Sequence, residues 1–286
     1  MWITVASGKG GTGKTTISVS LAIAANNAVY VDADVEEPNG ALFLNPTIDK
    51  EIVYTEPIPE IHTDKCIFCG KCADACVYKA IVILKPLKKA MFFPELCHSC
   101  GLCAYVCPVE GALIEVPKEK GKIRFGHTNK LEFIEGVLNL GEASATPLIR
   151  GMKKYIPKDK NVIIDAPPGT SCPVVESTED SDFTLLVTEP TPFGLNDLML
   201  TVSVIKQMHM PFGIVVNKSS KNDVIIDEYA DKEGIPILGR IPFDVKIAEQ
   251  YSKGVPAIYS LHNGEAVFSD IYFKIKGMVE NEKQSK

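Results

Sequence analysis

The chain has 286 residues, of which 45% are hydrophobic, and its formal net charge is −6. This length suffices for a sizeable core in one large domain or two modest ones. The acidic balance and the lack of a long run of Lys and Arg argue against a nucleic-acid-binding face. No apolar run approaches the roughly 20 residues that span a bilayer, and the N-terminus has no signal-peptide pattern. We therefore expect a cytoplasmic protein without a stable membrane anchor.

The first part of the chain predicts a strand at 3–6, a glycine-rich loop and a helix at 14–25. The loop fits the pattern G-x-x-x-x-G-K-[ST], and its place between a strand and a helix is the context that supports this motif. Glycines allow successive backbone N–H groups to converge on a phosphate, and the helix N-terminus adds partial positive charge. Lys14 is expected to reach the β- and γ-phosphates, and the Thr15 hydroxyl to bind Mg²⁺. The predicted phosphate-binding residues are Gly8, Lys9, Gly10, Gly11, Thr12, Gly13, Lys14, Thr15 and Thr16.

Strands and helices alternate along most of the remaining chain. Aliphatic runs typical of buried parallel strands lie at 28–31, 162–164, 184–187 and 213–216, and helical patterns lie at 194–208, 224–233 and 265–280. This order predicts an α/β fold with a mostly parallel, doubly wound sheet of the P-loop NTPase type. An apolar stripe on the last helix, which we expect to contact the core rather than lipid, is formed by Phe268, Ile271, Ile275 and Met278.

A cysteine-rich segment interrupts this alternation, because eight of the nine cysteines lie between Cys66 and Cys107. They form two copies of the pattern C-x2-C-x2-C-x3-C, which is typical of bacterial ferredoxins with two [4Fe–4S] clusters. The competing metal is zinc, but zinc ribbons usually need one C-x2-C per half. We therefore predict an inserted α+β ferredoxin-like domain at 61–117, with a discontinuous P-loop ATPase domain at 1–60 and 118–286.

The fourth cysteine of each motif in such ferredoxins binds the cluster of the other motif. The first cluster is then held by Cys66, Cys69, Cys72 and Cys107, and the second by Cys97, Cys100, Cys103 and Cys76. Solvent exclusion tunes cluster potentials, and the residues expected to shield the clusters are Ile67, Val77, Ile81 and Ala104. The sequence fits ordinary core positions for these four residues equally well.

Lys9 gives the phosphate loop the form K-G-G-x-G-K-[ST]. This form resembles the deviant Walker A motif of the MinD/ParA superfamily, which is related to the nitrogenase iron protein. The resemblance implies that Lys9 reaches across a dimer interface to the partner's nucleotide, and that Lys9, Lys14 and Asp34 are catalytic, with Asp34 positioning the attacking water. It implies that Asp165, with Thr15, holds Mg²⁺. It also implies nucleotide-binding roles for Asp32, Asp34, Asp165, Gly169, Asn217, Lys218, Pro242 and Asp244.

Together these features predict an ATP-binding and hydrolysing iron–sulfur protein that couples its nucleotide state to electron transfer with an unidentified redox partner. The resemblance implies a nucleotide-dependent homodimer, or a heterodimer with a paralogue. One alternative is an ATP-dependent carrier or assembly factor for iron–sulfur clusters or metal cofactors, with a cofactor-maturation partner. A second alternative is a spatial positioning ATPase like MinD. Carriers usually have a C-terminal C-x2-C, whereas no cysteine follows Cys172, which is either a small buried residue or a transient ligand.

Overall fold

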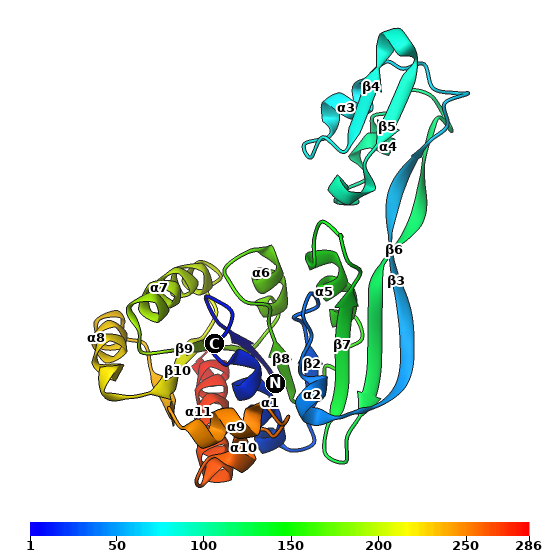
Figure 1. Cartoon of the computed structure of the whole chain (residues 1–286). Coiled ribbons are helices and arrows are strands. Elements are labelled where there is room, and N and C mark those ends of the chain that lie inside the picture. Colours follow the sequence, from blue (N-terminus) through cyan, green and yellow to red (C-terminus); the bar gives the residue numbers. More distant parts are fainter. Residues whose placement is uncertain (286) are drawn as a thin grey trace. The chain divides into compact units, whose positions relative to one another are not determined.

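A computed structural model of the chain describes residues 1–285, and its elements are shown in Figure 1. The chain divides into two compact units, which we call the sheet unit and the cysteine unit. The sheet unit comprises Met1–Glu51, Ile123–Val137 and Ile149–Lys286, and the cysteine unit comprises Ile52–Lys122 and Leu138–Leu148. The cysteine unit is wider than the predicted insert at 61–117, since it also contains residues 52–60, 118–122 and 138–148.

The main sheet has nine strands in the order β11-β10-β9-β1-β8-β2-β7-β6-β3. Its strands are β1 (Trp2–Ala6), β2 (Val29–Asp32), β3 (Thr47–Ile61), β6 (Leu113–His127), β7 (Glu132–Leu138), β8 (Val162–Asp165), β9 (Phe183–Thr188), β10 (Phe212–Ser219) and β11 (Ile237–Pro242). The pairs formed by β1 with β8 and β9, by β2 with β7 and β8, and by β10 with β9 and β11 are parallel. The predicted α/β fold with a large, mostly parallel sheet is thus confirmed.

Two apolar cores lie on the two faces of this sheet, because successive side chains of a strand point to opposite faces. Val5 and Val215 belong to one core, whereas their neighbours Ala6 and Val216 belong to the other. The first core also contains residues of α1 (Lys14–Ala25), α10 (Ala257–Ser260) and α11 (Gly264–Ser285), and the second contains residues of α6 (Cys172–Thr178), α7 (Pro192–Gln207) and α8 (Val224–Glu233). Phe268, Ile271 and Ile275 are fully buried in the first core, which confirms the interpretation of the stripe on α11.

The topology brings the polar ends of several strands to one point. The chain passes from β1 to β2 on one side, returns to β8 between them, and then crosses to β9 on the other side of β1. Ligands of open α/β sheets bind at such a switch point, beyond the carboxyl ends of the strands. Asp32 ends β2 and Asp165 ends β8, and the two are register partners in the parallel ladder.

The cysteine unit is built on parts of the two longest strands, β3 and β6, which are neighbours in the sheet. A Cβ at Gly126 would lie 2.3 Å from the carbonyl oxygen of Thr47, and the His62 N–H donates to the Ala112 carbonyl oxygen at 2.9 Å. These contacts at opposite ends show that the two strands run antiparallel. The elements between them are α3 (Lys71–Ala75), α4 (Leu102–Tyr105), the antiparallel hairpin β4 (Ile81–Leu84) and β5 (Lys89–Phe92), and two short 3₁₀ helices, η1 (Lys85–Leu87) and η2 (Pro94–Leu96).

The remaining helices complete the sheet unit and its links. They are α2 (Ala41–Leu44), α5 (Thr146–Lys153), α9 (Val245–Tyr251) and the 3₁₀ helix η3 (Lys221–Asp223). None of the helices within residues 1–285 has the length and apolar character that a membrane crossing requires.

Candidate functional site

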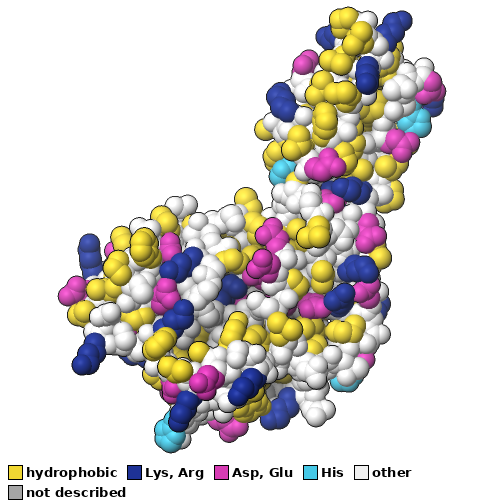
Figure 2. Space-filling view, viewed as in Figure 1, with side chains coloured by type: hydrophobic (Ala, Val, Ile, Leu, Met, Phe, Trp, Pro, Cys, Tyr) yellow, Lys and Arg dark blue, Asp and Glu magenta, His cyan; other side chains and the backbone are white. Residues whose placement is uncertain are grey.

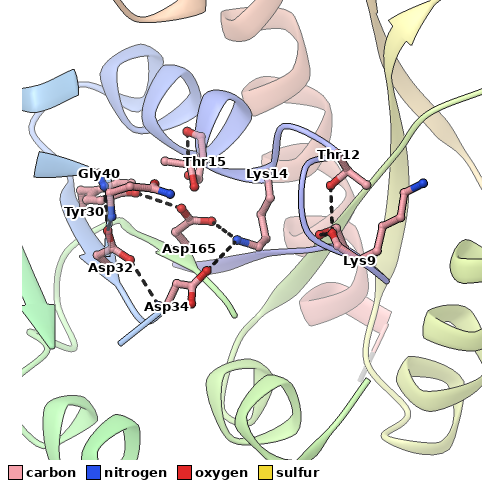
Figure 3. A network of polar contacts seen from close by, with 12 residues as sticks. Lys9, Thr12, Lys14, Thr15, Tyr30, Asp32, Asp34, Gly40 and Asp165 are labelled. Atoms are coloured by element: carbon pink, nitrogen blue, oxygen red, sulfur yellow. Dashed lines mark hydrogen bonds and ion pairs between the residues drawn. The ribbon is translucent and has the colours of Figure 1, made fainter. Parts of the chain in front are cut away.

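The glycine loop between β1 and α1 places Lys14 at the first turn of the helix, where its side chain is buried (Figure 3). The Lys14 Nζ lies 3.3 Å from Asp165 Oδ1 and 3.7 Å from Asp34 Oδ2. Thr15 follows in the same turn and is also buried. The structure therefore brings together the predicted phosphate-binding lysine, the predicted magnesium-binding pair and the acid expected to position water.

Asp32 and Asp165 are fully buried and are held by different sets of donors. Asp32 Oδ2 accepts from the backbone N–H groups of Asn39 at 3.1 Å and Gly40 at 2.8 Å, and Asp32 Oδ1 accepts from the Asp34 N–H at 3.2 Å. The Tyr30 hydroxyl donates to Asp165 Oδ2 at 3.1 Å. Asp32 thus fixes the loop that follows β2, while Asp165 is shared between Tyr30 and Lys14.

One lysine faces three carboxylates in this site, and the pKa values reflect the imbalance. Burial raises the pKa of Asp34 to about 6, although Lys14 partly offsets the effect. Burial and then the charge of Asp165 raise the pKa of Asp32 well above its usual value. Burial alone would lower the pKa of Lys14, but Asp165 and Asp34 outweigh it and raise that pKa. Carboxylate and hydroxyl oxygens suit Mg²⁺, so the excess negative charge fits a divalent cation.

Lys9 lies on the other side of the loop and forms an ion pair within its own chain. Its Nζ is 2.7 Å from Glu189 Oε1, and the Lys218 Nζ is 3.0 Å from Glu189 Oε2. Lys218 also donates to the Gly11 carbonyl oxygen at 3.0 Å. Figure 3 shows the Lys9 side chain pointing away from Lys14. Burial would raise the pKa of Glu189, but its bonds to Lys9 and Lys218 lower it. The carboxylate is therefore ionised at neutral pH and forms ion pairs with both lysines.

Asn217 packs tightly against the phosphate loop from the end of β10. Its Nδ2 donates to the Thr12 carbonyl oxygen at 2.7 Å, and a Cβ at Gly13 would lie only 2.1 Å from the same nitrogen. Gly13 also has a φ of +89°, in the region where side chains are strained. The Gly169 N–H donates to the Ser7 carbonyl oxygen at 2.9 Å, so it would have to leave this bond to reach a γ-phosphate.

The two residues expected to lie near the base occupy the end of β11 and the start of α9. Pro242 is the last residue of β11. Asp244 caps α9, because its Oδ1 accepts from the Lys246 N–H at 2.8 Å. The Asp244 side chain thus accepts its hydrogen bond from the first turn of the helix that it caps.

The predicted cluster ligands line two separate cavities in the cysteine unit. The first cavity is lined by Cys66, Cys69, Cys72 and Cys107 together with apolar residues such as Ile67, Phe68 and Ile83. The second is lined by Cys76, Cys97, Cys100 and Cys103 together with Tyr78, His98, Ser99 and Glu115. Each cavity thus combines three cysteines of one motif with the fourth cysteine of the other.

The two motifs also repeat in backbone conformation. Phe68 and Ser99 share a φ of +54°. The Phe68 N–H donates to Cys66 Sγ, and the Ser99 N–H donates to Cys97 Sγ, both at 3.4 Å. Four thiol donors with N–H groups directed at sulfur fit a thiolate-ligated cluster. Burial raises the pKa of the Cys103 thiol to about 11, so loading of a metal would have to displace protons.

Within residues 1–285, no three His, Cys, Asp or Glu side chains are grouped so that they could hold a single metal ion. Of the four residues expected to shield the clusters, Ile67 lines the first cavity and Ile81 the second. Val77 and Ala104 line neither cavity, and Val77 is 81% exposed. Hydrophobic side chains are prominent on the surface of the cysteine unit (Figure 2), and Leu87 and Tyr105 are also exposed. Cys172 begins α6 and is exposed, so the expectation of a small buried residue is wrong.

Two residues of the nucleotide site were not predicted from the sequence. Tyr30 lies two positions before Asp32 on β2, and this spacing places both on one face of the strand. Glu189 follows β9, at the same edge of the sheet as the phosphate loop. Glu189 is a polar residue directly after an aliphatic strand, which is a sequence signal for a site at the edge of the sheet. Tyr30 lies within a strand and has no such signal.

Comparison with known proteins relates the chain to one family of nucleotide-binding domains and to several individual proteins. Residues 3–257 match the CobQ/CobB/MinD/ParA nucleotide-binding domain. A relative without a functional name in Methanocaldococcus jannaschii is 34% identical, and the alignment covers 98% of each chain. An iron-sulfur cluster carrier protein of Pyrococcus abyssi is 27% identical over 90% of this chain and 78% of its own length. The solved cell division ATPase MinD of Pyrococcus furiosus has a TM-score of 0.58 at 21% identity, covering 97% of this chain and 98% of its own.

Proposed function

Because the chain belongs to the CobQ/CobB/MinD/ParA family of nucleotide-binding domains, we propose that it binds and hydrolyses ATP with Mg²⁺ and couples this cycle to electron transfer through two [4Fe–4S] clusters. The observation that carries the proposal is the coexistence, in one chain, of a phosphate loop at a sheet switch point and two cavities each lined by four cysteines. The partner is a redox protein, and the active form is a nucleotide-dependent dimer.

In the nucleotide site, the chain's own residues divide the work of binding and catalysis. The loop N–H groups and Lys14 bind the phosphates, and Thr15 with Asp165 holds Mg²⁺. Asp34 lies 3.7 Å from Lys14, close enough to orient a water toward the terminal phosphate. Gly169 exchanges its bond to Ser7 for one to the γ-phosphate, which links the nucleotide state to the segment after β8.

Lys9 supplies a second change that depends on the nucleotide. It leaves Glu189, 2.7 Å away in this structure, and contacts the nucleotide of a partner subunit. The Lys218 contact with Glu189 compensates part of the charge that Lys9 leaves behind. Hydrolysis removes the partner's terminal phosphate, so Lys9 returns to Glu189 and the dimer dissociates.

In the cysteine unit, the chain supplies eight thiolates and the N–H groups that orient them. A bound cluster would supply one-electron redox chemistry. Cys107 and Cys76 each connect one motif to the cavity of the other, so the two clusters are tied into one unit. Exposed apolar side chains of the cysteine unit, among them Leu87 and Tyr105, are available for contact with a protein that exchanges electrons.

The test is a stopped-flow measurement of cluster oxidation. Protein is purified without oxygen, its iron is quantified, and the reduced form is mixed with proteins that co-purify with it, with and without MgATP. We expect MgATP to change the oxidation rate, and Lys14→Ala, which keeps every cysteine, to remove this dependence. Equal rates for the wild type with and without MgATP, using an acceptor that is demonstrably reduced, would contradict the coupling.

A second function is favoured by one specific observation. Several relatives at 26–28% identity, each covering about nine-tenths of this chain, are iron-sulfur cluster carrier proteins. If the chain is such a carrier, iron should move to an apo-acceptor protein in the presence of MgATP. Retention of all iron by this chain during that incubation would favour resident clusters and electron transfer instead.

A further inference from the structure

The two cysteine motifs place different side chains at one matched position. Phe68 and Ser99 each follow the first cysteine of their motif by two residues. Both have a φ of +54°, and both donate their N–H to the sulfur of that cysteine at 3.4 Å. The two side chains therefore start from the same backbone geometry, and Phe68 lines the first cavity while Ser99 lines the second.

The Ser99 hydroxyl is left without a hydrogen bond. Its Oγ is buried and has no hydrogen-bond partner among the atoms that the structure describes. A buried hydroxyl without a partner is costly, and most such groups in proteins are paired. Thiolate and sulfide atoms in the second cavity would be acceptors for it. Phe68 has no donor to offer the first cavity.

We propose that the Ser99 hydroxyl donates a hydrogen bond to the sulfur of the second cluster and thereby raises the reduction potential of that cluster. This inference rests on the proposed presence of clusters. Reduction adds one electron from an external reductant, and no bond between protein and cluster forms or breaks. The added negative charge spreads over the sulfurs, so a donor stabilises the reduced state more than the oxidised one. The second cluster therefore accepts an electron more readily than it would without this hydroxyl.

A nearby carboxylate acts in the opposite direction and provides a control. Glu115 lines the same cavity, and its Oε1 would lie 3.3 Å from a Cβ at Gly101. Its negative charge disfavours reduction of the second cluster. Because Glu115 is exposed, salt screens its effect, whereas the contribution of the buried Ser99 hydroxyl is insensitive to salt.

The experiment is a redox titration of the holoprotein with dithionite and mediators, followed by electron paramagnetic resonance. Ser99→Ala is expected to lower the ratio of reduced to oxidised second cluster about tenfold at a fixed potential, which equals a fall of about 59 mV for a one-electron couple. The first cluster should be unchanged. Phe68→Leu, the matched control, should alter neither ratio by this amount. Glu115→Gln should shift the second cluster the other way, and only this shift should shrink at high salt.

The outcomes separate the inference from the proposed function. If the wild-type protein contains far fewer than about eight iron atoms per chain, the proposal that it binds two clusters is wrong. If Ser99→Ala retains full iron and the second potential is unchanged, only the role of Ser99 is overturned. If Ser99→Ala loses iron, Ser99→Gly replaces it, because glycine tolerates the positive φ. Loss of the second cluster from both variants would show that Ser99 holds the loop together, and would also overturn a tuning role.

Discussion

Burial in the folded protein makes ionisation of the Asp34 carboxyl less favourable than in the unfolded chain. Its pKa is raised to about 6, compared with about 3.9 for an unfolded aspartate. Between these two values the folded state binds more protons than the unfolded state, so stability falls as the pH rises through this window. Above pH 6, the ionised Asp34 therefore destabilises the nucleotide-free protein.

Asp34→Asn should accordingly stabilise the nucleotide-free protein by about 1–2 kcal/mol at pH 7.5, by removing this charge. The gain should disappear near pH 4, where the wild-type carboxyl is also neutral. Urea unfolding of both proteins at the two pH values measures the difference. The same variant should lose ATPase activity, because an amide orients water less well than a carboxylate. A stability gain of equal size at both pH values would exclude the ionisation as its cause.

Single residues were predictable from the sequence where a contiguous motif fixes them. Lys14, Asp34 and Asp165 meet within 4 Å, and each was predicted from a strand end or the phosphate loop. Tyr30 and Glu189 were not, because their roles depend on which strands become neighbours. The exposure of Cys172 was also not predictable, since a position just after a loop gives no periodic signal of burial.

The contact between β10 and the phosphate loop depends on Gly13. A methyl group at this position would meet the Asn217 amide, and its φ of +89° disfavours any side chain. Gly13→Ala is expected to destabilise the protein by roughly 2 kcal/mol or more, from backbone strain and overpacking. It should also abolish ATP binding. Thermal unfolding and nucleotide titration measure the two effects.

Gly10→Ala is the matched control for Gly13→Ala. A Cβ at Gly10 has nothing within 4 Å, so the folded protein should tolerate the substitution with a stability change below about 0.5 kcal/mol. Comparable destabilisation by the two substitutions would mean that the packing against Asn217 is not the cause.

The crossed grouping of the cysteines predicts which cluster each substitution removes. Cys107 belongs to the second motif but lines the first cavity, and Cys76 shows the reverse. Cys107→Ser should therefore perturb the first cluster, and Cys76→Ser the second, as seen in iron content and in the paramagnetic resonance of the reduced protein. Cys172→Ser, outside both cavities, should leave the iron content unchanged. If Cys107→Ser altered the second cluster alone, the grouping would be wrong.

Elements with a clear aliphatic or helical pattern were predicted well, including the mixed-composition helix α8, which occupies the predicted range 224–233. The helix at 14–25 and the strand at 162–164 agree closely with α1 and β8. Strand β7 was missed, because its sequence contains two glutamates and a glycine. Glu135 is nevertheless buried there, and Arg124 donates to it at 3.2 Å. Only the neighbouring strand supplies that partner, so local patterns could not reveal it.

At the scale of the whole molecule, the proposed role of Lys9 is to make association of two subunits depend on bound nucleotide. Lys9→Ala should remain monomeric in the presence of MgATP, because it cannot reach the nucleotide of a second subunit. Glu189→Gln should associate at lower MgATP concentrations than the wild type, since it releases Lys9 from its ion pair at 2.7 Å. Light scattering after size exclusion measures both. A dimer of Lys9→Ala that responds to MgATP like the wild type would contradict this role.

The chain enters the cysteine unit along β3 and leaves it along β6, and these two strands are neighbours in the sheet. The Thr47 backbone approaches Gly126 at one end of the pair, and His62 bonds to Ala112 at the other. Loop tips are the places where folds accept inserted domains, and an antiparallel pair closed by a short turn would be the simplest precursor here. Insertion of the cysteine unit at such a hairpin tip would leave the order of every strand around the phosphate loop unchanged.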